Sequence, residues 1–232
     1  MYNNNFHLWS VALFLMIFFC GCSDTEKTEQ FQNDYNLTGV TSLKIVNING
    51  NVSISNDVTP DTLIHVYALK RTFSLINDDL SNVTINVTGG VNMKIESIYK
   101  TTANVFVDYT IKLPANVSID IDDTTGNINV DGVSNVGTIR TTTGDIKIKN
   151  VTYITNIIST TGYLDVNIND IKNDISLSTT NGGIKVYFKP NLNANLKTSK
   201  LSGVINNNGV ALSGSYNINI SVYNGNINLY YQ

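Results

Sequence analysis

The 232-residue chain has little charge, proline or cysteine. Only 14% of its residues are charged, and a formal net charge of −3 gives no basic footprint, so we predict no nucleic-acid partner. The two cysteines, Cys20 and Cys22, are too close together for an ordinary disulfide, which excludes a disulfide scaffold. Strong helix formers are scarce beside abundant Asn, Thr, Ile and Val, which argues against a helical bundle.

Residues with catalytic or metal-binding chemistry are also few. His65 is the only histidine beyond the N-terminal segment, and it stands in the strand-like run LIHVYAL. A nucleophilic Cys–His or Ser–His pair would need this residue, and zinc would need a His/Cys cluster that the sequence lacks. We therefore predict no enzyme activity, no catalytic residue, no metal ligand and no cofactor.

Carboxylates leave one alternative open. Asp120, Asp122 and Asp123 lie close together in the sequence, and Asp145 and Asp165 could stack above them as a ladder for Ca²⁺. Asp120 and Asp122 alternate with isoleucines, as polar residues do on the solvated face of an ordinary strand. We prefer this interpretation, a solvated strand face, to a Ca²⁺ site. Because β-helix enzymes that cleave acidic polysaccharides use Asp, Lys and Arg, a pectate-lyase-like enzyme remains the alternative.

The N-terminus carries a targeting signal. The first 22 residues contain no charged side chain, and Leu8–Phe19 is an apolar run of about a dozen residues. This run is shorter than the ~20 residues of a spanning helix and suits a secretory signal. It ends in FCGC, which resembles the lipobox of prokaryotic lipoproteins, although Phe19 and Cys20 depart from the usual residues there.

The lipobox resemblance implies that residues 1–21 are a signal peptide and that Cys22 is the site of lipid attachment. The polar residues 22–35 would then form a solvated tether between the lipid and the folded domain. An ordinary signal peptide and an uncleaved anchor are the alternatives. All three place the rest of the chain outside the cytoplasm, and lipidation makes the membrane a partner.

A glycine-centred repeat is the most informative feature. The segments TTGNINV, TTTGDIKI, TTGYLDV and TTNGGIKV recur with glycines 18, 18 and 20 residues apart, and a looser copy surrounds Gly203. We predict that the repeat glycines have a structural role in turns: Gly50, Gly126, Gly144, Gly162, Gly182 and Gly225.

Aliphatic residues stand two and four positions after these glycines, with polar residues between them. This alternation predicts strands with one buried face, and a period of about 20 residues is typical of a β-solenoid. We predict an all-β chain in which residues 36–232 form a β-solenoid, or single-stranded β-helix-like repeat domain, with a less regular N-terminal β cap. The repeats are strongest over 119–188, Tyr230 and Tyr231 are expected to close the C-terminal end, and a β-sandwich is the alternative.

Two segments resemble a known family. VDYTIKLPANVSIDIDDTTGNINVDGV and TIRTTTGDIKIKNV are similar to the putative-adhesin family of prokaryotic envelope proteins, a domain of unknown function with Thr-Thr-Gly-Asp-Ile repeats. Asp145 keeps the aspartate that the family often has after the glycine, whereas Asn127, Tyr163 and Gly183 replace it. The resemblance covers about residues 36–232, is strongest over 105–188, and implies a β-helix-like domain displayed outside the membrane.

Together these features predict a non-enzymatic, membrane-anchored lipoprotein of the cell envelope, on the cell surface or in the periplasm. Its domain would be adhesin-like or structural, with surface carbohydrate or protein as the expected partner. An accessory role in envelope-stress signalling is a further alternative.

Overall fold

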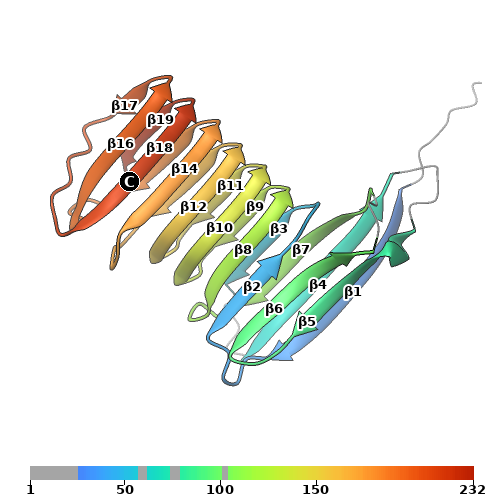
Figure 1. Ribbon diagram of the computed structural model, residues 1–232. Coiled ribbons are helices and arrows are strands. Elements are labelled where there is room, and N and C mark those ends of the chain that lie inside the picture. Colours follow the sequence, from blue (N-terminus) through green and yellow to red (C-terminus); the bar gives the residue numbers. More distant parts are fainter. Residues whose placement is uncertain (1–25, 57–61, 74–78, 101–103) are drawn as a thin grey trace, which may run out of the picture.

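A computed structural model describes residues 26–56, 62–73, 79–100 and 104–232 (Figure 1). In these residues the chain is strand and turn apart from one short 3-10 helix, η1 (Leu80–Asn82), so the predicted all-β class is confirmed. The same residues contain no helix that is long and apolar enough to cross a membrane. The predicted signal peptide, 1–21, and the predicted lipid site, Cys22, lie outside the described residues.

The described strands form two large sheets. In spatial order, the nine-stranded sheet contains β16 (Ala194–Ser202), β18 (Tyr216–Asn224), β14 (Ile175–Asn181), β12 (Tyr153–Thr161), β10 (Asn135–Thr143), β8 (Ser118–Thr125), β2 (Ser42–Val46), β6 (Asn92–Tyr99) and β5 (Val83–Thr88). The ten-stranded sheet contains β1 (Lys27–Asn36), β4 (Leu63–Thr72), β7 (Phe106–Leu113), β3 (Val52–Asn56), β9 (Ile128–Asp131), β11 (Ile146–Lys149), β13 (Leu164–Ile168), β15 (Ile184–Phe188), β19 (Ile227–Tyr231) and β17 (Ile205–Asn207).

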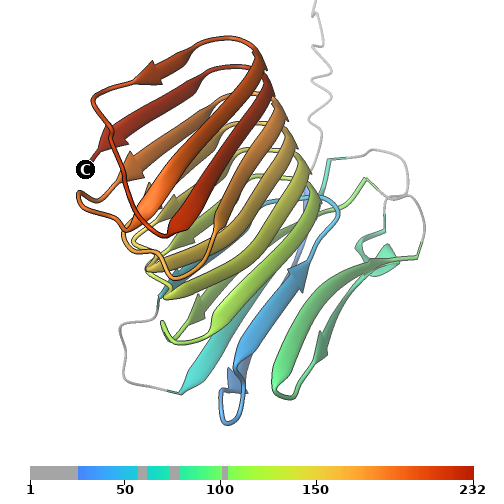
Figure 2. The same cartoon turned by 60° about the vertical axis from the view of Figure 1, so that its left-hand side comes forward.

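The chain alternates between the two sheets. A strand of the nine-stranded sheet is followed by a tight turn and a strand of the ten-stranded sheet, as in β8–β9, β10–β11, β12–β13 and β14–β15. We call each such pair a unit. Neighbouring units pair in parallel in both sheets, and their turns form a row along one edge (Figure 2).

The core consists of aliphatic columns that run across the units. Ile121, Ile139, Ile157 and Leu177 are aligned from strand to strand in one sheet, and all are fully buried. The other sheet aligns Ile128, Ile146, Leu164 and Ile184 in the same way. A single unit exposes its inner aliphatics, and stacking removes each of them from water at about 1.5–3 kcal/mol per side chain.

At the C-terminal end, spatial order departs from sequence order. β18–β19 pairs between β14–β15 and β16–β17, so the Gly203 copy forms the last unit (Figure 1). The reason lies in the inward positions, where β16 has Thr198 and Lys200 aligned with Ile220 and Val222 of β18. The long charged side chain of Lys200 is costly to bury between two neighbouring strands, and β16 accordingly lies at the end of the sheet. The expectation that Tyr230 and Tyr231 close this end is therefore wrong.

The N-terminal end is reordered as well. β2–β3 lies between β6–β7 and β8–β9, because β2 pairs in parallel with both β6 and β8 and β3 with both β7 and β9. Beyond them, β4, β1 and β5 pair in antiparallel fashion, as the prediction of a less regular N-terminal β segment anticipates.

Residues 27–36 differ from the expectation of a solvated tether, because they form β1. This strand pairs along its whole length with β4, which satisfies its backbone hydrogen bonds. Phe31 and Tyr35 pack against the core, and Glu29 forms a 2.8 Å ion pair with the buried Lys70. A polar composition is compatible with such an edge strand because only two of its side chains need an apolar contact.

Candidate functional site

The row of turns is built on stacked glycines. The predicted turn glycines lie there, and Gly203 joins them, each next to the corresponding glycine of the adjacent unit. A Cβ on Gly144 would lie 1.9 Å from the carbonyl oxygen of Gly126, and a Cβ on Gly162 would lie 2.0 Å from that of Gly144. Several also adopt positive φ, such as 153° at Gly162, which L side chains rarely adopt. Only glycine therefore allows units to stack this closely at the corner.

A polar column lies just inside this corner. The residues three positions before the glycines are buried although they are polar: Asn47, Asp123, Thr141, Ser159 and Thr179. The hydroxyl of Ser159 donates to the carbonyl oxygen of Gly144 at 3.2 Å, and that of Thr179 donates to Gly162 at 3.1 Å. These bonds tie each strand end to the turn of the neighbouring unit.

Asp123 occupies the same column without such a bond. Its side chain is buried, and neither carboxyl oxygen has a hydrogen-bond partner. Burial raises the pKa of Asp123 to about 7. The backbone N–H groups of Thr124 and Thr125 offset part of this shift but lie outside hydrogen-bond geometry. Asp123 is thus a buried acid of the core and faces no open site.

On the outside of the corner, the residue after each glycine builds a hydrogen-bonded ladder. The N–H of Asn127 donates to Oδ1 of Asn51 at 2.9 Å, and the N–H of Asp145 donates to Oδ1 of Asn127 at 2.9 Å. The N–H of Tyr163 continues the series by donating to Oδ1 of Asp145 at 2.8 Å. A short Asn or Asp side chain at this position therefore links each unit to the next.

Large apolar side chains are exposed along the same corner in the C-terminal units. Tyr163, Leu201, Val204 and Tyr223 are 65%, 66%, 54% and 55% exposed, and each lies within two residues of a corner glycine. We call these four residues the corner surface. Grouped apolar exposure of this kind is typical of a contact site rather than of an inert surface.

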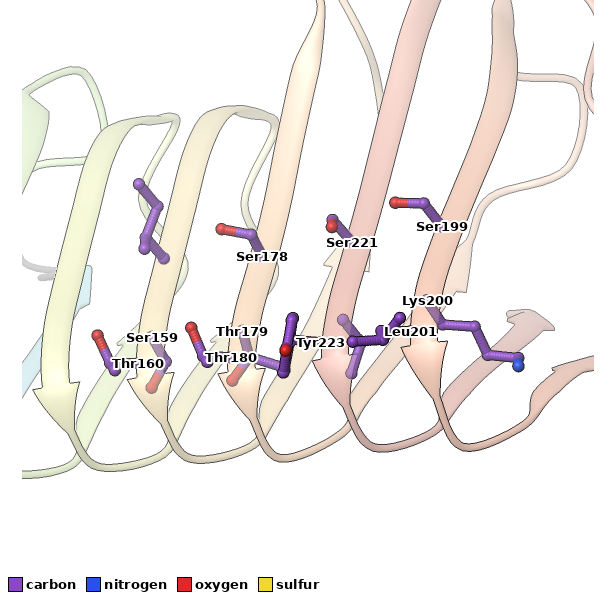
Figure 3. A pocket seen from close by; sticks show the side chains of 12 residues that line it. Ser159, Thr160, Ser178, Thr179, Thr180, Ser199, Lys200, Leu201, Ser221 and Tyr223 are labelled. Atoms are coloured by element: carbon purple, nitrogen blue, oxygen red, sulfur yellow. The ribbon is translucent and has the colours of Figure 1, made fainter.

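A shallow groove of about 470 Å³ lies on the nine-stranded side of the corner. Figure 3 shows Tyr223 between Thr180 of β14 and Leu201 of β16. A row of small hydroxyl side chains, Ser178, Ser221 and Ser199, runs alongside in strand register. The groove thus combines one aromatic ring with several hydroxyl groups.

A second pocket, of about 460 Å³, lies on the ten-stranded side of the corner. Tyr163, Gly183 and Asn226 line its wall nearest the turns, and Asp165 and Lys185 come from β13 and β15. The Lys185 ammonium lies 4.9 Å from the ring centre of Tyr187 and 5.4 Å from that of Tyr230. A hydrogen bond with Tyr187 raises the pKa of Lys185, which therefore stays positively charged.

The alternative of a carboxylate ladder for Ca²⁺, which the sequence left open, is wrong. Asp120 and Asp122 are in β8 of the nine-stranded sheet, whereas Asp145 and Asp165 lie on the other side of the corner. Asp120 accepts from the N–H of Thr138 at 2.6 Å, and Asp122 pairs with Lys44 at 2.5 Å. The five carboxylates therefore do not converge, and the described residues contain no group of three or more His, Cys, Asp or Glu side chains that could hold a metal.

His65 lies in β4, as the alternation predicts, with its Nδ1 2.8 Å from Oδ1 of Asp34 in β1. This contact joins two neighbouring strands of the cap and is far from the corner in the strand order.

Sequence reasoning did not identify the corner surface or the two pockets. Tyr163 stands where the repeat has Asn or Asp, and this departure was the available signal. Tyr223 gave none, because it lies beside Thr180 only when β18 pairs directly with β14, and the sequence does not reveal that order.

No protein-family model and no curated protein sequence matches this chain. Among solved structures, a putative cell adhesion protein from Clostridium sporogenes is 16% identical, covers 89% of this chain and 100% of its own, and gives a TM-score of 0.51. A putative adhesin from Bacteroides fragilis is 11% identical over 86% of this chain and 97% of its own, with a TM-score of 0.43. The first match shows that this two-sheet fold also occurs in an experimentally determined structure.

Proposed function

We propose that the chain is a non-enzymatic, adhesin-like protein that is displayed outside the cytoplasm on a lipid attached to Cys22. Its parallel units form a β-solenoid, and the antiparallel strands at the N-terminal end act as its cap. The observation that carries the proposal is the corner surface, where exposed aromatic and aliphatic side chains lie at the corner and three of them line the two pockets. The name of the structurally similar protein from Clostridium sporogenes supports the same function.

A carbohydrate-cleaving enzyme fits the geometry less well. Such an enzyme needs at least three Asp, Lys or Arg side chains around one groove. Lys200 is the one charged residue among those that line the groove of Figure 3, and its other polar groups are hydroxyls. A surface that makes many small contacts with a partner suits these residues better than one that supplies an acid and a base.

The adhesin-like function is tested on whole cells. Cells that carry the wild-type protein, a deletion strain, and cells that carry Leu201→Ser/Tyr223→Ser are compared for attachment to glycan-coated and protein-coated surfaces. We expect attachment to fall to the deletion level in the double variant. Phe73→Ser is the matched control, since Phe73 is 46% exposed but packs against Phe106, far in the strand order from the units that carry the corner surface. Equal attachment by wild-type and deletion strains would refute the proposal.

Lipidation is tested separately by metabolic labelling with palmitate. We expect label on the wild-type chain and none on Cys22→Ala, while Cys20→Ala keeps the label because cleavage removes Cys20. Unchanged labelling of Cys22→Ala would contradict lipid attachment at this residue.

A further inference from the structure

The outer ladder is interrupted at the second pocket. Tyr163 and Gly183 occupy two successive ladder positions, and neither side chain can accept a hydrogen bond as Asn or Asp does. No hydrogen bond of the described residues uses the N–H of Gly183 or of Asn226. Beyond the gap the ladder resumes, because Oδ1 of Asn226 accepts from the N–H of Val204 at 2.9 Å.

The interruption leaves two parallel donors at one pocket. Adjacent strands in a sheet are about 4.8 Å apart, so the two N–H groups are separated by about one strand spacing. Gly183 is buried, and a buried backbone N–H without an acceptor is costly and rare. A ligand that supplies acceptor oxygens at this spacing would remove that cost.

The same pocket also contains an acceptor without a donor. Oδ1 of Asp165 is buried and has no hydrogen-bond partner, although Asp165 lies in register between Lys147 and Lys185. The positively charged Lys185 lines the same pocket, so the two opposite charges together favour a neutral ligand over an anion or a cation. An apolar ligand would leave both the N–H donors and this oxygen without partners.

Tyr163 supplies a flat apolar surface beside these polar groups. The Cδ1–Cε1 edge of its ring lies near Gly183, where an added Cβ would be 3.1 Å from both carbons. The side chain is nevertheless 65% exposed, so ring surface beside Gly183 is open to a ligand. An open aromatic face accepts the C–H surface of a sugar ring, and sugar hydroxyls both donate and accept hydrogen bonds.

We propose that the pocket bounded by Tyr163, Asp165 and Asn226 binds a neutral saccharide. The sugar ring stacks on Tyr163, two of its oxygens accept from the N–H groups of Gly183 and Asn226, and a hydroxyl donates to Asp165. The volume of about 460 Å³ is in the range of small-molecule sites. This inference rests on the proposed adhesin-like function and names its ligand class.

The test uses Tyr163→Asn in the full chain. This change removes the stacking surface and restores the ladder acceptor opposite the N–H of Gly183, so it separates binding from folding. Binding is measured by saturation-transfer NMR and calorimetry with glucose, galactose, mannose, N-acetylglucosamine and their β-linked oligomers. We expect the wild type to bind at least one of them, and Tyr163→Asn to weaken that affinity about tenfold or more with an unchanged or higher Tm.

Two further variants complete the experiment. Asp165→Asn keeps the shape of the pocket but changes its acceptor, and we expect weaker binding. Phe73→Asn is the matched control and should leave saccharide affinity unchanged, because Phe73 is an exposed aromatic residue that packs against Phe106 and lines neither pocket. A wild type that binds none of the sugars, or a Tyr163→Asn variant that binds as the wild type does, overturns the proposal.

The outcomes also distinguish this site from the general function. Cells with Leu201→Ser/Tyr223→Ser could lose attachment while Tyr163→Asn keeps full saccharide binding. This result would refute the saccharide site and support the adhesin-like function. Saccharide binding that depends on Tyr163, without any attachment defect in the deletion strain, would support the saccharide site and refute the adhesin-like function.

Discussion

Asp123 shows how a single buried residue in the corner sets the response of the fold to pH. Ser159 and Thr179 of the same column donate to glycine carbonyls of the neighbouring unit, which an ionised carboxylate cannot do. Its folded-state pKa of about 7 lies above the ordinary aspartate value of 3.8, so the folded chain binds the proton more tightly than the unfolded chain. The contribution of Asp123 to stability is therefore complete below about pH 4 and is lost as the pH rises to 7.

We predict that Asp123→Thr raises the free energy of unfolding at pH 7.5, by up to about 4 kcal/mol. The gain should shrink as the pH is lowered toward 4, because the wild-type carboxyl is then neutral. Urea unfolding at several pH values measures this difference. Asp122→Thr is the matched control on the exposed face of the same strand, and a gain of the same size there would contradict the explanation.

A second prediction at the residue scale concerns the stability loss when a corner glycine is replaced. Gly162→Ala places a Cβ 2.0 Å from the carbonyl oxygen of Gly144 at a φ of 153°. We expect a loss of at least about 3 kcal/mol in the free energy of unfolding, since both backbone strain and a clash with backbone are introduced.

Gly209→Ala is the control for backbone strain alone. Gly209 also has a positive φ, 79°, but no atom lies within 4 Å of an added Cβ. Its loss should stay near 1–2 kcal/mol in the same thermal or urea unfolding experiment. Equal losses in the two variants would mean that the close stacking of glycines contributes nothing.

At the scale of elements, β16 protects the open end of the molecule. Its outer edge has no strand partner among the described residues, and such an edge can pair with another chain. Thr198 stands where the inner units have Ile or Leu, and Lys200 stands where they have Val or a smaller polar residue. A further unit stacked there would therefore bury a hydroxyl group and a charged amine. The same two residues explain why β18 lies inside and β16 outside.

Thr198→Ile/Lys200→Ile should therefore promote end-to-end association. We expect larger species by light scattering than for wild type at equal concentration, increasing with protein concentration. Lys197→Ile is the matched control, because Lys197 is also a lysine of β16 but is aligned with outward-facing Asn219. Association of the control to the same extent would show that added hydrophobicity alone is responsible.

At the scale of the whole molecule, the order of the last two units places the C-terminal strands β18 and β19 inside the stack. β18–β19 pairs with units on both sides, so removing residues 216–232 breaks four parallel ladders. It would also bring polar Thr198 and Lys200 against β14. We expect the Tm to fall by on the order of 10 °C or more, or cooperative unfolding to be lost.

Deletion of residues 194–215 is the comparison for this truncation. It removes the terminal unit and lets residues 189–193 join β15 to β18, as residues 169–174 join β13 to β14. Thermal unfolding followed by circular dichroism should show a smaller fall in Tm for this internal deletion. A smaller fall for the 216–232 truncation would contradict the central position of β18–β19.

Much of the fold could be predicted from the sequence because the repeat is defined by residues that are close together in the chain. Two-residue alternation decides which side chains face inward, and the glycine period decides where the chain turns, so residues such as Ile146 and Ile148 could be assigned to the core. The order of units could not be predicted. The order depends on which unit has polar side chains that must stay accessible to water at the end of the stack. Lys200 identifies that unit only once its alignment with Val222 is known.

The candidate site was less predictable for the same reason. Tyr163 is a visible departure from the repeat, yet the free N–H groups of Gly183 and Asn226 arise from parallel stacking of separate units. The β1 strand likewise forms because it pairs with β4, and the polar composition of β1 does not indicate this pairing.

The sequence by itself determined the all-β class, the inward aliphatic positions and the glycine corner, because these follow from side-chain alternation and from the one residue type that a close turn allows. The tertiary structure alone decided the order of the units at both ends, the pairing of β1 and the two pockets at the corner. Those features depend on which strands become neighbours, and that choice is made by burial and hydrogen bonding across the whole stack.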